Sequence, residues 1–267
     1  MLTIKNFNLY SFAVGSKHVR AFSINNNSGV IADYVLGICG VQDSPFSEKF
    51  YEKVGFGIDG IEMASRDETQ KLLATRDHLL LSERTSKIGQ SLSSSDQTFN
   101  QAKYVMPNIL SFMNKPKAIF LGMVWHYTES QIRPREKWNH PAASDLTGKT
   151  IKFPLDSKEH PSEINVRLTY RRKLGESFVT KGKDDYINII FNVFDANTSE
   201  LWPSKDEQGS DEENPSRIMC VSIDVQRMLN PRILLNSQLF DEHLDYCNRT
   251  IKPSVKQMLE KIGFELQ

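Results

Sequence analysis

A glycine run is the first group of residues whose types and spacing could do chemistry. Gly55, Gly57 and Gly60 match GxGxxG, with which a strand, a turn and a helix N-terminus hold a dinucleotide pyrophosphate. The segment from Ser44-Pro45 to Gly55 instead predicts a capped helix, and the IEMASRDE that follows has no helix start. The partner motifs of a kinase glycine loop do not follow either. We interpret the run as a helix end, a turn and a strand, and we expect no cofactor.

Carboxylates and a histidine form the second group. Asp59 and Glu62 could hold Mg²⁺, but Ala64 occupies the position where a nuclease lysine would support that role. His126 and Glu129 close an apolar run and could do acid–base work. A surface role for the acids and a backbone hydrogen bond for the histidine are the simpler interpretations.

Histidine and cysteine spacing gives little support for a metal site or a covalent mechanism. His243 and Cys247 lie four residues apart, but zinc needs two more ligands and the other histidines show no second pair. Cys39 and Cys220 are far from them and no CxxC occurs, so we predict reduced thiols. The chain also lacks GxSxG. We expect His243 and Cys247 to pack in the core, without a metal.

Local clusters of cations are the third group, and they are the candidate site for an anion or nucleic acid. They comprise Arg133, Arg135 and Lys137 around Trp138, then Arg167, Arg171, Arg172 and Lys173 along one strand with Tyr170, and Lys181 and Lys183 in the turn beyond it. Pairing of that hairpin would gather the cations at one end of one sheet face, where they could contact phosphates beside stacking aromatics. Ordinary solubility and protection of a sheet edge explain the same pattern.

Composition limits the classes of protein to which this chain can belong. The 267 residues include 33 Lys plus Arg and 33 Asp plus Glu, with pI near 7.0, so a cationic field over the whole surface is excluded. The apolar fraction of 39% and the charged fraction of 25% are globular values. The N-terminal residues do not resemble a secretion signal and the longest apolar run, 118–127, is too short to span a membrane. We predict a soluble cytoplasmic protein with no membrane partner.

Hydrophobic periodicity predicts the elements that must position these residues. We expect a β-hairpin over 4–24 turning at Gly15-Ser16, a short helix within 29–40 and a helix over 44–55. Residues 70–82 fit one helix or two antiparallel strands. A helix over 99–113 and a strand over 118–129 follow. The second half predicts strands over 164–171, 185–195 and 217–225, then a helix over 237–263 that Pro253 breaks near 251–252.

These elements predict an α+β fold, a mostly antiparallel sheet in two lobes with helices packed on the sheet faces. The lobes are residues 1–130 and 162–267, and a proline-rich irregular connection, 131–161, joins them.

Three functions are consistent with the sequence. The leading hypothesis is a non-enzymatic binding or assembly protein that acts through a protein partner or as a homo-oligomer. Its partner-facing surfaces would be the basic hairpin 167–183 and an acidic loop, 206–214. The second hypothesis is a nucleic-acid-binding protein that uses the same hairpin. The third is a metal-dependent nuclease or hydrolase that uses Asp59, Glu62 or His126.

Overall fold

An antiparallel sheet of ten strands organises the protein in the computed structural model. The structure describes residues 5–47, 51–87, 89–92, 95–130, 165–174, 178, 184–202, 217–261 and 264–266. Its strands run in the order β2-β3-β4-β5-β1-β6-β9-β8-β7, and the short β10 pairs with β1 in parallel. The strands are β1 (Lys5–His18), β2 (Lys53–Gly57), β3 (Gly60–Ala64), β4 (Gln70–Thr75), β5 (His78–Arg84), β6 (Ala118–Glu129), β7 (Asn165–Lys173), β8 (Tyr186–Asn197), β9 (Arg217–Ile233) and β10 (Phe264–Leu266).

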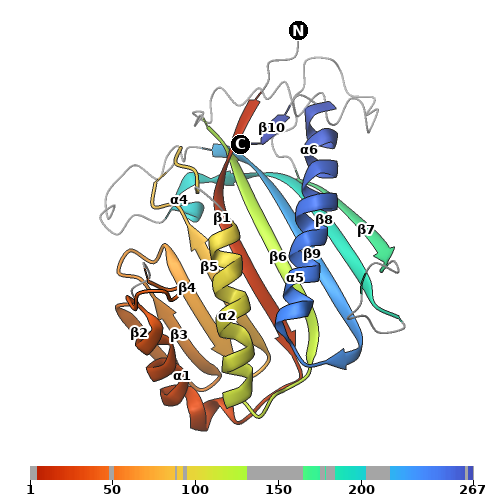
Figure 1. Ribbon diagram of the computed structural model, residues 1–267. Helices are drawn as coiled ribbons and strands as arrows, with labels where there is room; N and C mark the ends of the chain where they lie inside the picture. Colours follow the sequence, from red (N-terminus) through yellow and green to blue (C-terminus); the bar gives the residue numbers. More distant parts are fainter. Residues whose placement is uncertain are drawn as a thin grey trace.

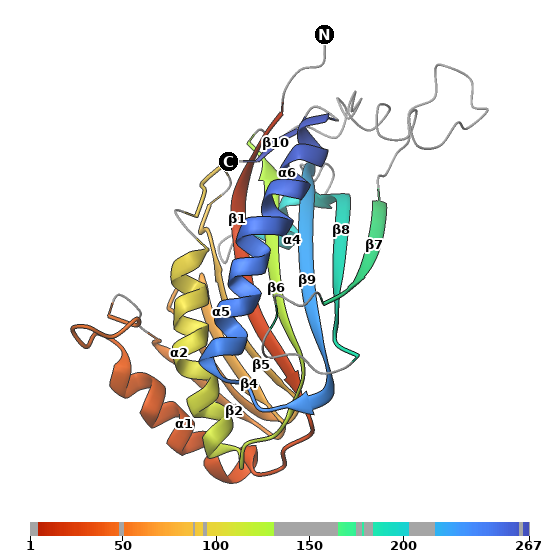
Figure 2. The same ribbon diagram turned by 45° about the vertical axis from the view of Figure 1, so that its right-hand side comes forward.

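Helices cover one face of this sheet, which we call the helical face (Figures 1 and 2). They are α1 (Ile24–Ile38), α2 (Asp96–Phe112), α5 (Ser237–Tyr246), the π-helix η2 (Cys247–Ile251) and α6 (Lys252–Lys261). The four-residue α4 (Thr198–Leu201) lies behind the sheet in Figure 1, on the opposite face, which we call the open face. The predicted α+β class, with a mostly antiparallel sheet and helices on it, is confirmed.

Alternation along the strands assigns side chains to the two faces. Trp125 pairs with Ile223 and Ile223 with Phe191, which places three buried apolar side chains on the helical face. One residue further, His126 and Ser222 lie on the open face. The core therefore sits between the sheet and the helices. The Phe12 and Trp125 rings pack 5.4 Å apart within it, and burying each such side chain contributes roughly 2 kcal/mol.

Two predicted elements of the N-terminal region are wrong. Residues 5–18 form one continuous strand, because β5 and β6 pair with it on both sides through Gly15. A Cβ at Gly15 would lie 3.1 Å from the Leu79 carbonyl oxygen, so glycine permits a close strand approach there and not a turn. The predicted helix 44–55 is also absent from the described part of that segment. Residues 44–47 form a turn and Lys53 begins β2.

Most other predicted elements are confirmed. Residues 70–82 form two strands joined at Arg76-Asp77, and α2 continues through Pro107. The predicted strands of the second half correspond to β7, β8 and β9. The break expected near 251–252 coincides with η2, which ends at Ile251.

The predicted division into two lobes stays a prediction, since residues 131–164 lie outside the described residues. Strands from both sides of that segment belong to one sheet, in which β6 pairs with β9. Among the described helices, none is long and apolar enough to cross a membrane.

Candidate functional site

Strand β7 is the last strand of the sheet and carries the described part of the predicted basic hairpin. It pairs with β8 from Asn165↔Phe194 to Lys173↔Tyr186, and no other described strand pairs with it. Each of its nine residues except Val166 is exposed. A sheet edge of this kind presents backbone donors and acceptors that another chain can use. We therefore take the β7 edge as the candidate site.

The two sides of β7 differ in chemistry. Arg172 pairs with Ile187, which pairs with Arg227 on the helical face, and Arg172 Nη1 donates to the Tyr246 hydroxyl at 3.4 Å. Leu168 and Tyr170 share this side by alternation and are 37% and 52% exposed. The open-face side carries mainly cations, namely Arg167, Arg171 and Lys173, with Thr169 between them.

Two contacts hold the Arg171 side chain in place. Its guanidinium carbon lies 4.5 Å from the centroid of the Tyr186 ring, and its Nε donates to Asn188 Oδ1 at 3.1 Å. Both partners are on β8, on the open face. The guanidinium group thus has a defined orientation although it is exposed, which reduces the entropy lost when it binds a carboxylate or phosphate.

Asp224 on β9 lies on the open face and interacts electrostatically with Arg167. Burial raises the pKa of Asp224, although a hydrogen bond from Gln226 and the charge of Arg167 act against that increase. Gln226 Nε2 donates to Asp224 Oδ2 at 2.8 Å. Asp224 is thus a partly buried carboxyl that is bonded to Gln226 and attracts Arg167.

The structure brings together only part of the predicted cationic cluster. Arg167 and Arg171 lie on the open-face side of β7, and Arg172 lies on the helical side. The remaining predicted members, with Trp138, fall outside the described residues and their placement stays a prediction: Arg133, Arg135, Lys137, Lys181 and Lys183. The acidic loop 206–214 also lies outside the described residues.

Asp59, Glu62 and His126 do not meet. Asp59 Oδ1 pairs with Arg76 Nη1 at 3.3 Å, and Glu62 Oε1 with Lys71 Nζ at 3.3 Å. His126 is on β6, and β4, β5 and β1 lie between it and β3. Strand spacing of about 4.8 Å separates β3 from β6 by roughly 19 Å. The described residues contain no group of three or more side chains placed to hold a metal ion.

Histidines and cysteines of the described residues form packed clusters on opposite faces of the sheet. His126 lies beside Tyr10, with ring centroids 5.9 Å apart, and Trp202 covers Tyr10 at 5.2 Å. Burial lowers the pKa of His126 and raises that of the neighbouring Cys220 to about 12, so that thiol is not a ready nucleophile. On the helical face, Cys247 Sγ lies 4.0 Å from His243 Nε2, and both residues are fully buried.

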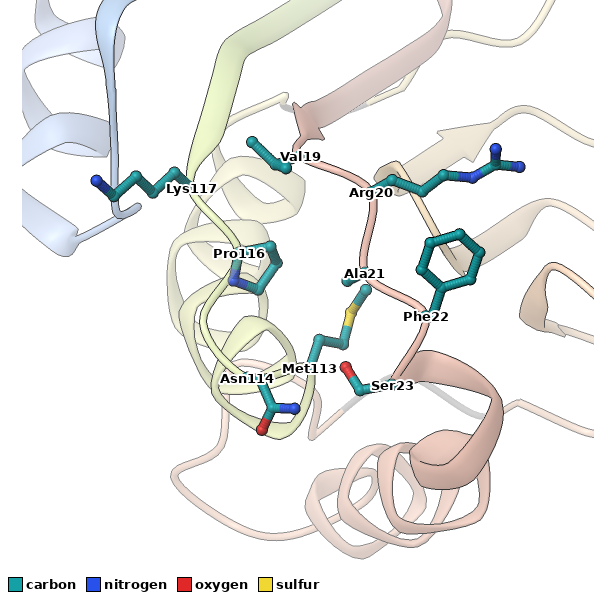
Figure 3. Close-up of a pocket in the computed structure, with 9 residues that line it drawn as sticks. All are labelled: Val19, Arg20, Ala21, Phe22, Ser23, Met113, Asn114, Pro116 and Lys117. Carbon is teal, nitrogen blue, oxygen red and sulfur yellow. The ribbon is translucent and has the colours of Figure 1, made fainter.

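A cavity of about 370 Å³ lies at the end of the sheet where β1 leads into α1 and α2 leads into β6 (Figure 3). Val19, Ala21, Met113 and Pro116 give it apolar walls. Arg20 and Lys117 extend away from it in opposite directions (Figure 3). None of the described residues that line the cavity is an acid, a histidine or a cysteine. No sequence motif marks it, because its walls come from two connections about 90 residues apart in the chain.

Comparison with known proteins adds no assignment to this geometry. No protein-family model matches the chain, and no curated protein matches it. The functional argument therefore depends on the residues and contacts described above.

Proposed function

We propose that this is a binding protein that takes up an extended segment of a partner protein along the β7 edge. One observation carries the proposal: nine consecutive strand residues are nearly all exposed, and β8 is the only described strand that pairs with them. Strand addition to such an edge gains affinity from backbone hydrogen bonds and specificity from alternate side chains.

The alternation on β7 defines the chemistry of that segment. On the helical side the incoming strand would meet exposed Leu168 and Tyr170, so apolar residues fit there. On the open side it would meet Arg167, Arg171 and Lys173, so acidic residues fit there. The expected partner segment therefore alternates acidic and apolar residues, and its charges determine register and association rate more than affinity.

The same cations disfavour a second copy of this chain as the occupant. If the β7 strands of two copies paired antiparallel with Thr169 at the centre, Arg167 of each copy would lie opposite Arg171 of the other. Like charges directly opposite on neighbouring strands are destabilising, and edge cations of this kind oppose self-pairing. We expect a monomer by size-exclusion chromatography with light scattering.

A synthetic peptide tests the proposal directly. The probe is an end-blocked nonapeptide in which Glu alternates with Val, and its control has the same composition with all Glu residues grouped at one end. Fluorescence anisotropy should show binding of the alternating peptide, weakening as salt rises. The double variant Arg167→Glu/Arg171→Glu should bind at least tenfold more weakly. The matched variant Lys256→Glu/Lys261→Glu, which changes two exposed cations on α6, should bind like the unmodified protein.

Two results would contradict strand addition. Equal binding of the alternating and grouped peptides would remove the role of side-chain order. Tighter binding of oligothymidylate than of the peptide, lost in the Arg167→Glu/Arg171→Glu variant, would favour the nucleic-acid hypothesis for the same residues.

A further inference from the structure

Ser95 and Lys252 are 157 residues apart in the chain and meet beside the sheet, with Lys252 Nζ 3.1 Å from Ser95 Oγ. Ser95 is the residue before α2, and Lys252 is the first residue of α6. The Ser95 side chain is buried, whereas those of Lys252 and Asp96 are 32% and 58% exposed. A hydroxyl and an amine at this distance are the two parts of a nucleophile and its base.

The Ser95 hydroxyl is not used to cap its helix. Serine at this position usually accepts a backbone N–H of the first turn, but Ser95 makes no such bond. Its oxygen instead lies 3.3 Å from the indole nitrogen Nε1 of Trp125, which donates to it. The indole N–H occupies one lone pair of the Ser95 oxygen. Because the Trp125 ring is buried, this hydrogen bond holds the oxygen beside the Lys252 amine.

Burial and nearby charges act in opposite directions on the protonation of Lys252. Burial lowers the pKa of Lys252, and the charges of Asp96 and Cys247 act against that decrease. Asp96 Oδ1 is 4.0 Å from Nζ and exposed, so its effect is screened by solvent. The positive end of the α2 dipole lies next to the amine and also disfavours the ammonium form. A neutral lysine can accept a proton from a hydroxyl, which an ammonium group cannot.

The backbone before Lys252 is unusual. Residues Cys247–Ile251 form η2, and Lys252 follows it directly. π-Helical turns are rare and occur frequently at functional sites. This observation is independent of the contact between Lys252 and Ser95.

We propose that Ser95 is a nucleophile, that Lys252 is its general base, and that the site accepts an acyl group from an ester or amide. The Ser95 Oγ–acyl carbon bond forms while the bond from that carbon to the leaving group breaks. The hydroxyl proton passes to the neutral Lys252 amine and then to the leaving group. The inference goes beyond peptide binding at β7, which uses a different part of the molecule and does not depend on it.

An activity-based probe tests this site without knowledge of its substrate. An alkyl fluorophosphonate forms an oxygen–phosphorus bond with an activated serine and releases fluoride, and peptide mass spectrometry locates the adduct. We expect one adduct, on Ser95, forming faster as pH rises through the titration of Lys252, with Asp96 and Cys247 as the charged or titratable neighbours. Ser95→Ala should abolish the adduct. Ser254→Ala, which changes an exposed serine on α6, should not affect it.

Two lysine variants separate a base from a structural contact. Lys252→Met removes the amine, and Lys252→Arg keeps a cation that cannot accept a proton at neutral pH. Both should label at least tenfold more slowly if Lys252 is the base, with unchanged circular dichroism confirming that they fold. An unlabelled Ser95 in the unmodified protein, or Lys252→Arg labelling at the original rate, would overturn the proposal.

Discussion

His243 Nε2 lies 4.0 Å from Cys247 Sγ, one helical turn away, and both side chains are fully buried against β9. The fully buried Arg227 is also part of this environment. Its Nη2 is 3.3 Å from Glu242 Oε2, and its guanidinium carbon is 4.9 Å from the Phe178 ring centroid. The contact between α5 and β9 thus includes an ionised pair next to a histidine that is enclosed by protein. Protonation of His243 must therefore be linked to folding.

Stability should fall as pH falls below about 6.5, in part because of His243. Burial, followed by the charge of Arg227, lowers the pKa of His243 to about 3, whereas an unfolded histidine titrates near pH 6.5. Above that pH neither state is protonated. Between the two values only the unfolded state binds the proton, so each unit of decreasing pH costs about 1.4 kcal/mol. Urea unfolding at pH 7 and pH 5 measures the change.

The variant His243→Leu isolates the contribution of this one group. It removes the titrating side chain at a fully buried position, so the loss of stability between pH 7 and pH 5 should become smaller. His18 and His126 retain the same sign of dependence, because burial lowers the pKa of each. An unchanged pH profile in His243→Leu would show that this histidine is not kept neutral in the folded protein.

Gly60 should be the sensitive member of the glycine run. It is the first residue of β3 and has φ of +149°, and a Cβ there would be 2.0 Å from the Ala74 carbonyl oxygen. Gly60→Ala should therefore cost at least about 2 kcal/mol in urea unfolding. At Gly57 a Cβ would lie 3.9 Å from the Gly60 carbonyl oxygen, so Gly57→Ala should stay within about 1 kcal/mol. Equal losses would contradict a tight-turn role for Gly60.

Local sequence patterns correctly predicted the elements whose apolar side chains alternate or recur regularly. They failed where contacts with residues distant in the sequence determine the structure. Alternation of Val166, Leu168 and Tyr170 with polar residues correctly predicted the strand β7, because alternation depends only on the local sequence, although every residue of β7 except Val166 is exposed. The cap signals at Ser44-Pro45 predicted a helix that extended into residues that form β2 in the structure. Pairing of β2 with β3 outweighs the preference of these residues for a capped helix, which is worth about 1 kcal/mol.

The candidate sites also differ in whether local sequence patterns could predict them. Arg167 and Arg171 were found as a cationic strand, since their spacing alone puts them on one face. The meeting of Ser95 with Lys252 could not be predicted, because neither residue belongs to a motif and 157 residues separate them. Only the tertiary fold brings the first residue of α6 to the start of α2.

Arg171→Lys should distinguish an oriented guanidinium from simple positive charge at the β7 edge. Lysine keeps the charge but loses the planar group that stacks on Tyr186 and the Nε donor to Asn188. Since both contacts are exposed, unfolding free energy should change by less than about 1 kcal/mol. Affinity for the alternating Glu–Val peptide should nevertheless fall several-fold, because a mobile ammonium group must be ordered on binding. Anisotropy titration beside urea unfolding measures both quantities. Unchanged peptide affinity would mean that the β7 surface acts through charge alone.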